Sequence, residues 1–128
     1  MTIHQNESDE PDFLFSQMPT NLAPQNGQVF VRGRRLAHTD FATGQHDESA
    51  QNPAWTEQGG KLGPHYVNNS CNACHFKNGR AIPPPPGGAM NQYVVKVQNS
   101  DGAADTQFGH VLQPARTSGT GEPGVSLA

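Results

Sequence analysis

The sequence contains few of the residues from which a large apolar core is built. Hydrophobic residues make up 33% of its 128 residues and aromatic residues 7%, whereas it has 14 glycines and 11 prolines. This composition disfavours long regular elements and excludes a large hydrophobic core. The length suits one domain. We therefore expect one domain with much loop, in which a bound group supplies apolar bulk.

Concentrated positive charge and long apolar runs are also missing. The net charge is -3, and the eight basic residues are scattered apart from Arg32, Arg34 and Arg35, so we expect no nucleic-acid partner. The longest apolar runs are only a few residues, which excludes a transmembrane helix. The first residues have neither the basic start nor the apolar stretch of a signal peptide.

Cysteine is scarce, and both copies lie in one motif, Cys71-Asn72-Ala73-Cys74-His75. Two thiols three positions apart lie on nearly one face of a helical turn, so both can form thioethers to the vinyl groups of one haem. The adjoining His75 can then bind the iron as its proximal ligand. The motif therefore predicts one covalently attached haem c, held by Cys71, Cys74 and His75.

The residues on either side of the motif indicate how it is presented. Ser70 is a suitable N-cap and Gly79 a suitable C-cap, which predicts a short helix over residues 71–78. Arg80 follows closely enough to pair with a haem propionate, because a guanidinium can donate two parallel hydrogen bonds to a carboxylate. The other interpretation of Arg80 is a solvated surface arginine.

Other chemistries remain open for the two thiols. A C-x-x-C pair alone also suits a redox dithiol, a disulfide or half of a zinc site. A four-ligand zinc site would need His75 and a distant residue such as His65 or His110, without the paired spacing of structural zinc sites.

The sixth iron ligand decides between two kinds of haem function. A ligand opposite His75 gives an iron suited to electron transfer, whereas an open position permits peroxide to bind. Met90 lies fifteen residues beyond His75 and His110 thirty-five beyond it. We favour Met90 over His110 and His65 as the ligand, with loop packing or a surface position as the alternative for each.

The sequence outside the cysteine motif predicts a mainly α, cytochrome c-like haem domain with much loop and one small β-hairpin. Residues 1–26 are acidic and rich in proline and are expected to form a flexible arm, which leaves 27–128 as an incomplete haem domain. Apolar residues at three-to-four spacing predict an amphipathic helix over 28–41, with a strand over 29–31 as the alternative because Gly33 weakens the helix. Residues 43–63 predict a long loop, with Trp55 packed locally or against the haem edge. Alternation over 91–98 predicts a strand that pairs with 109–114, with the turn at 99–105.

These residues also resemble a known family, the bacterial di-haem oxidoreductases, which are relatives of di-haem cytochrome c peroxidases and are described as thiol oxidoreductases. The resemblance covers roughly residues 27–128 and is centred on the first haem motif. Its positions here are Leu62, Gly63, Pro64, Asn68, Ser70–Phe76, Gly79, Arg80, Pro83 and Pro84, with Gly33–Leu36, Phe41, Phe108–Gln113 and Glu122 on either side.

The chain also departs from the family pattern. Asn78 stands where family members have aspartate, and Ala81 stands where they have a second glycine. Family members are several times longer and carry a second C-x-x-C-H, which this chain lacks. Peroxidase-like catalysis that relays electrons between two haems would therefore have only one of its two haem sites in this chain.

The resemblance implies haem binding and electron transfer as the N-terminal part of a di-haem, peroxidase-like oxidoreductase. The expected partner is a redox protein or a C-terminal haem domain outside this sequence. A stand-alone small c-type cytochrome is the alternative. Since c-type haem is attached outside the bacterial cytoplasm, we expect a periplasmic or otherwise extracytoplasmic protein. The sequence would then represent a fragment, a mature form or a gene with a misplaced start.

Overall fold

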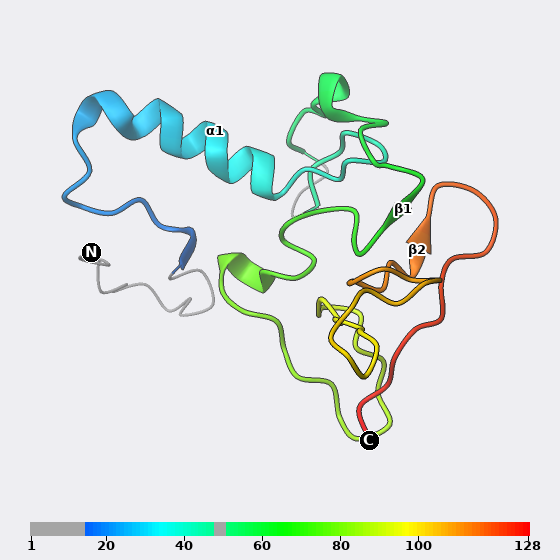
Figure 1. Cartoon of the computed structure of the whole chain (residues 1–128). Coiled ribbons are helices and arrows are strands. Elements are labelled where there is room, and N and C mark those ends of the chain that lie inside the picture. The colour runs from blue at the N-terminus through cyan, green and yellow to red at the C-terminus, as the bar shows by residue number, and fades with distance from the viewer. Residues whose placement is uncertain (1–14, 48–50) are drawn as a thin grey trace.

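The computed structural model describes residues 15–47 and 51–128. Its elements are short and are joined by long loops (Figure 1). In order they are η2 (Pro24–Asn26), α1 (Gly27–Ala37), η3 (Thr56–Gln58), β1 (His65–Tyr66), η4 (Phe76–Asn78) and β2 (Ala115–Arg116), where η marks a 3-10 helix. α1 extends to one side of the molecule, and β1 and β2 lie toward the other (Figure 1).

α1 is the helix that the apolar spacing predicts over 28–41, but it ends four residues earlier, at Ala37. It begins directly after a proline-initiated 3-10 turn, in which the fixed φ of Pro24 suits the first helical position. At the other end His38 leaves the helix with ψ near 5°. The Thr39 hydroxyl then donates a 2.8 Å hydrogen bond to the Arg35 carbonyl. The helix stops because His38 and Thr39 turn into the interior.

The helical content is smaller than the sequence predicts. α1 is the one α-helix in the described ranges, and the prediction of a helix over residues 71–78 is wrong. A single turn takes its place, in which the Cys71 carbonyl accepts hydrogen bonds from the amides of Cys74 (3.2 Å) and His75 (2.9 Å). η4 follows, and Lys77 inside it has a left-handed φ of 50°. This left-handed residue prevents the turn from continuing as an α-helix.

The predicted capping of this turn by Ser70 is confirmed. The Ser70 hydroxyl oxygen accepts a 3.1 Å hydrogen bond from the Ala73 amide, three residues later. A serine oxygen in this position satisfies one of the free amides at the start of a helical turn. The cap therefore forms even though the turn does not become a helix.

The predicted pairing of 91–98 with 109–114 forms only as a short antiparallel contact. Lys96 pairs with Val111 as an isolated bridge. Backbone hydrogen bonds flank it, one from the Val97 amide to the His110 carbonyl and one from the Leu112 amide to the Val95 carbonyl, both 3.0 Å. The turn within 99–105 is present, since the Asn99 amide donates to the Ala103 carbonyl. The sequence did not predict the two-stranded sheet of β1 and β2, which is antiparallel.

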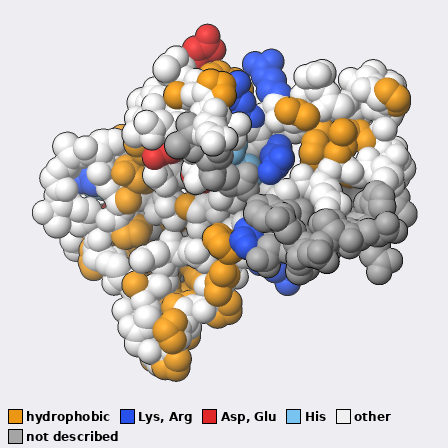
Figure 2. Space-filling model, turned by 180° about the vertical axis from the view of Figure 1, so that it is seen from behind, with side chains coloured by type: hydrophobic (Ala, Val, Ile, Leu, Met, Phe, Trp, Pro, Cys, Tyr) orange, Lys and Arg blue, Asp and Glu red, His pale blue; other side chains and the backbone are white. Residues whose placement is uncertain are grey.

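The interior of the described part is mostly polar. Leu112 is its only buried hydrophobic residue, whereas the side chains of His38 and Thr39 are fully buried and Ser16 and Ser70 are also buried. Hydrophobic side chains instead lie in several separate groups on the surface seen in Figure 2. Because so little apolar area leaves water, hydrogen bonds must specify much of this fold.

Only part of the predicted N-terminal arm, residues 1–26, can be compared with the structure. Residues 1–14 lie outside the described residues, while Ser16 is buried and contacts Asn78. The segment 15–26 therefore touches the region of the cysteine motif. Across 15–47 and 51–128, no helix has the length and apolar character needed to cross a bilayer.

Candidate functional site

His75 ends the Cys71–His75 turn, and its side chain is exposed. Its Nδ1 lies 3.2 Å from the Gly79 carbonyl oxygen, which can only accept a hydrogen bond. Nδ1 must therefore carry the proton, and in a neutral imidazole this leaves the lone pair on Nε2. A neutral histidine held in this way by a backbone carbonyl is well suited to bind a metal through Nε2.

Both cysteines of the motif are free thiols, with Cys71 exposed and Cys74 half-buried. The side-chain amide of Asn68 lies 3.8 Å from the Cys74 sulfur and donates a 2.9 Å hydrogen bond to the Asn91 carbonyl. Asn68 therefore connects the second thiol to the segment that follows Met90. Two unpaired thiols next to an exposed histidine fit the requirements of covalent haem attachment.

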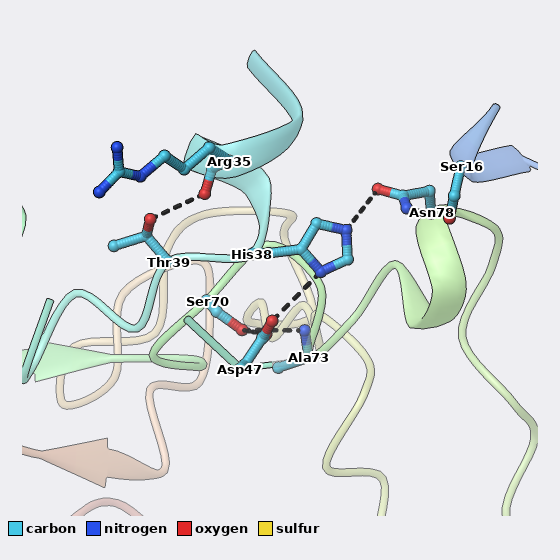
Figure 3. A network of polar contacts seen from close by, with 8 residues as sticks. All are labelled: Ser16, Arg35, His38, Thr39, Asp47, Ser70, Ala73 and Asn78. Carbon is cyan, nitrogen blue, oxygen red and sulfur yellow. Dashed lines mark hydrogen bonds and ion pairs between the residues drawn. The ribbon is translucent and has the colours of Figure 1, made fainter. Parts of the chain in front are cut away.

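A buried histidine, His38, lies at the centre of a polar network beside the motif (Figure 3). Its Nδ1 is 3.2 Å from an Asp47 carboxylate oxygen and its Nε2 is 3.0 Å from the Asn78 side-chain oxygen. Both facing atoms are acceptors, and an imidazolium can donate to both at once. The His46 ring stacks on His38, with 5.3 Å between centroids. Asp47 therefore gives the buried ring a carboxylate partner at Nδ1.

The network reaches the motif from both sides. Before the cysteines, the Ser70 hydroxyl donates a 2.9 Å hydrogen bond to Asp47, and Ser70 in turn caps the Ala73 amide. After them, Asn78 accepts from His38 and its side-chain amide donates a 2.7 Å hydrogen bond to the Ser16 hydroxyl. We call His38, Asp47, Ser70, Asn78 and Ser16 the polar centre.

Sequence reasoning did not find His38, Asp47 or Ser16 as parts of this site. His38 is one of six histidines, and no spacing motif separates it from the others. Asn78 gave the one available signal, because it stands where the family that the sequence resembles has an aspartate. In the structure it also has a left-handed φ of 59°, which asparagine tolerates better than most residues.

The candidates for the sixth ligand lie in different surroundings. Met90 is half-buried, and its amide donates to the Val125 carbonyl. Asn91, next to Met90, is joined to Cys74 through Asn68, which places this segment beside the motif. His110 is exposed and belongs to the contact between 95–97 and 110–112. His65 lies in β1, and its Nδ1 is buried without a hydrogen-bond partner.

Arg80 and Trp55 show how the predicted accessory residues are placed. Arg80 is exposed and follows directly after Gly79, which holds His75. The guanidinium groups of Arg32 and Arg35 lie over the Trp55 ring, at 5.6 and 5.1 Å from its centroid. Arg35 also donates to the Pro53 carbonyl. Two of the three clustered arginines are thus held at Trp55, which packs locally against α1.

A cavity of about 430 Å³ lies beside α1, with Phe30, Arg34 and His46 in its lining and none of Cys71, Cys74 and His75. Ser16, which belongs to the polar centre, and His46, which stacks on His38, also line the cavity, so the cavity adjoins the polar centre.

The described residues do not converge on a zinc site. Within 15–47 and 51–128, no three histidine, cysteine, aspartate or glutamate side chains gather closely enough to hold a metal ion. Zinc requires such convergence, because its four ligands surround one centre at about 2.0–2.3 Å. Thioether attachment does not, since the two vinyl groups of a haem lie on different pyrrole rings.

Comparison with known proteins identifies no relative: no family model, curated protein or solved structure matches the chain.

Proposed function

We propose that Cys71, Cys74 and His75 hold one covalent haem c and that the chain transfers electrons. As its family resemblance implies, it would act as the N-terminal part of a di-haem, peroxidase-like oxidoreductase outside the cytoplasm. The bound haem would supply one-electron redox chemistry. Its electron partner would be a second haem domain or a separate redox protein.

The observation that carries this proposal is the hydrogen bond between His75 Nδ1 and the Gly79 carbonyl. It leaves the Nε2 lone pair free to bind a metal, on an exposed turn that also bears two free thiols. A structural histidine has no need of this exposure. A disulfide or a dithiol has no need of an oriented histidine directly after the second cysteine.

The surroundings of the motif support a role in electron transfer. Asn68 joins Cys74 to Asn91, the residue after Met90, and this proximity supports Met90 as the sixth ligand. A histidine and methionine pair gives a saturated iron that is suited to electron transfer. Arg80, exposed and adjacent to Gly79, is our assignment for a propionate partner.

The test is the pyridine haemochrome spectrum of the chain, expressed with an export signal in cells that attach c-type haem. We expect a c-type band that remains with the protein after acid-acetone extraction. The matched control carries Cys71→Ala and Cys74→Ala and should retain no covalent haem. A folded wild-type product without the band would contradict the proposal, and metal analysis would then decide between zinc and a disulfide.

The sixth ligand is tested in the haem-loaded chain with Met90→Ala and His110→Ala. We expect Met90→Ala to change the ligand-sensitive absorption bands and His110→Ala to leave them as in the wild type. Unchanged spectra in both variants would exclude these two residues as ligands.

A further inference from the structure

The turn that follows His75 contains two consecutive left-handed residues that are not glycine. Lys77 has φ 50° and Asn78 has φ 59°. A left-handed conformation is unfavourable for an L-residue other than glycine. Such a conformation persists only where the surrounding structure holds it in place.

The polar centre supplies that restraint through Asn78. His38 Nε2 lies 3.0 Å from the Asn78 side-chain oxygen, and the Asn78 side-chain amide donates to Ser16 at 2.7 Å. Both polar atoms of the Asn78 side chain are thereby used. His38 is itself fully buried and held on its other nitrogen by Asp47, so its position is fixed.

The residue after this anchored turn is Gly79, whose carbonyl faces His75 Nδ1 at 3.2 Å. A change in the backbone dihedral angles of Asn78 also moves the Gly79 carbonyl, because Gly79 is the next residue in the chain. If the Gly79 carbonyl moved away, the proton on His75 Nδ1 would lose its hydrogen-bond acceptor. The imidazole would then donate less electron density to the iron. The contacts thus form one chain from His38 through Asn78 and Gly79 to His75.

We infer that His38 is a positioning residue for His75: it anchors Asn78 so that the Gly79 carbonyl sets the orientation and basicity of the proximal ligand. This inference rests on the proposed haem function. His38 acts through the turn and does not touch the ligand, since its two ring nitrogens face Asp47 and Asn78.

Two substitutions separate the two hydrogen bonds of His38. The side-chain nitrogen of asparagine lies near the position of Nδ1, so His38→Asn keeps a donor to Asp47 and loses the one to Asn78. Glutamine reaches the position of Nε2, so His38→Gln keeps the donor to Asn78. Both variants remove the imidazole ring. Their difference therefore reports on the bond to Asn78.

The first readout is the midpoint potential of the haem-loaded full chain, measured by redox titration. A ligand that loses its carbonyl partner donates less electron density and stabilises ferric iron less. We expect the potential of His38→Asn to lie above that of His38→Gln, and that of His38→Gln to lie closer to the wild type.

The second readout is the exchange of the His75 Nδ1 proton with solvent, followed by NMR on histidine-labelled, reduced protein. Loss of the anchor should accelerate this exchange about three- to tenfold in His38→Asn, as expected for losing one hydrogen bond. Asn78→Gly, which retains the left-handed backbone without the side chain, should behave like His38→Asn.

Equal potentials and exchange rates in His38→Asn and His38→Gln would overturn the inference, because His38 would then act through packing alone. The same holds if Asn78→Gly matches the wild type in both readouts. Failure of the proposed function is separate, since it shows in the wild-type haemochrome before any variant is made.

Discussion

The polar centre around His38 and the turn that bears His75 are neighbours with opposite properties. His38 is completely buried and both of its ring nitrogens face acceptors. His75 is exposed and has one nitrogen held by a backbone carbonyl. The same side chain thus serves as a structural connector in one region and as a candidate ligand in the other. Burial with two partners marks the first role, and exposure with one partner marks the second.

This difference shows where specificity comes from in a chain with little apolar material. Among the described residues the fully buried side chains are His38 and Thr39, both polar. Hydrogen bonds cost much when broken but add little net stability when formed. The polar centre can therefore define the geometry of the turn, whereas under the proposed function apolar contacts with the bound haem would supply much of the net stability.

The largest expected effect is the loss of cooperative folding when the haem is removed. The variant with Cys71→Ala and Cys74→Ala should show no cooperative thermal transition by circular dichroism, while the haem-loaded wild type should melt cooperatively. The reason is that Leu112 is the only buried hydrophobic residue in the described ranges. Native circular dichroism with cooperative melting of the haem-free chain would show that the polar centre is sufficient alone.

Within the polar centre, Asp47→Ala should destabilise the haem-loaded chain by ~2–3 kcal/mol, measured by urea denaturation. Asp47 accepts from both His38 and Ser70, so its removal leaves a buried ring nitrogen without its acceptor. Asp47→Asn is the matched control and retains one acceptor oxygen, so its cost should be smaller. Similar costs for the two variants would argue that the carboxylate acts through charge alone.

The loop that carries Asp47 back to His38 depends on Gly44. Its φ is 78°, and a Cβ there would lie 2.6 Å from the Trp55 carbonyl oxygen. We expect Gly44→Ala to cost ~2 kcal/mol or more in urea denaturation. Gly60→Ala is the control, since Gly60 has a similar φ of 69° but open space around its Cβ position. Its cost should stay near 1 kcal/mol, as given by the backbone conformation alone. An equal loss of stability in Gly44→Ala and Gly60→Ala would show that the Trp55 backbone moves to make room for the new methyl group.

The smallest expected effect is a gain in stability at the turn after His75. Lys77→Gly removes a left-handed lysine and should stabilise the haem-loaded chain by ~0.5–1 kcal/mol, measured as a shift of the urea midpoint. The polar centre does not include Lys77, so the midpoint potential should stay at the wild-type value. Asn78→Gly should destabilise instead, because it loses the bonds to His38 and Ser16. Stabilisation by both changes would contradict the restraint by His38.

Local patterns in the sequence predicted local structure well. Apolar spacing located α1, and a serine before the cysteines located the cap at Ser70. Alternation located the contact between 95–97 and 110–112. The predictions were wrong about how far the helices continue. α1 ends at Ala37, and the turn after Ser70 does not become a helix. α1 stops at His38, a residue of the polar centre, and the turn after Ser70 is followed by two left-handed residues, Lys77 and Asn78.

The sequence by itself determined the candidate chemistry, because the spacing of Cys71, Cys74 and His75 is a local property that one turn of chain can express. Only the tertiary structure decided which histidine is buried and which is exposed, and that Asp47 and Asn78 meet His38 while Ser16 meets Asn78. These contacts join residues up to 62 positions apart. No short pattern encodes such a contact, since it depends on how the intervening loops fold back.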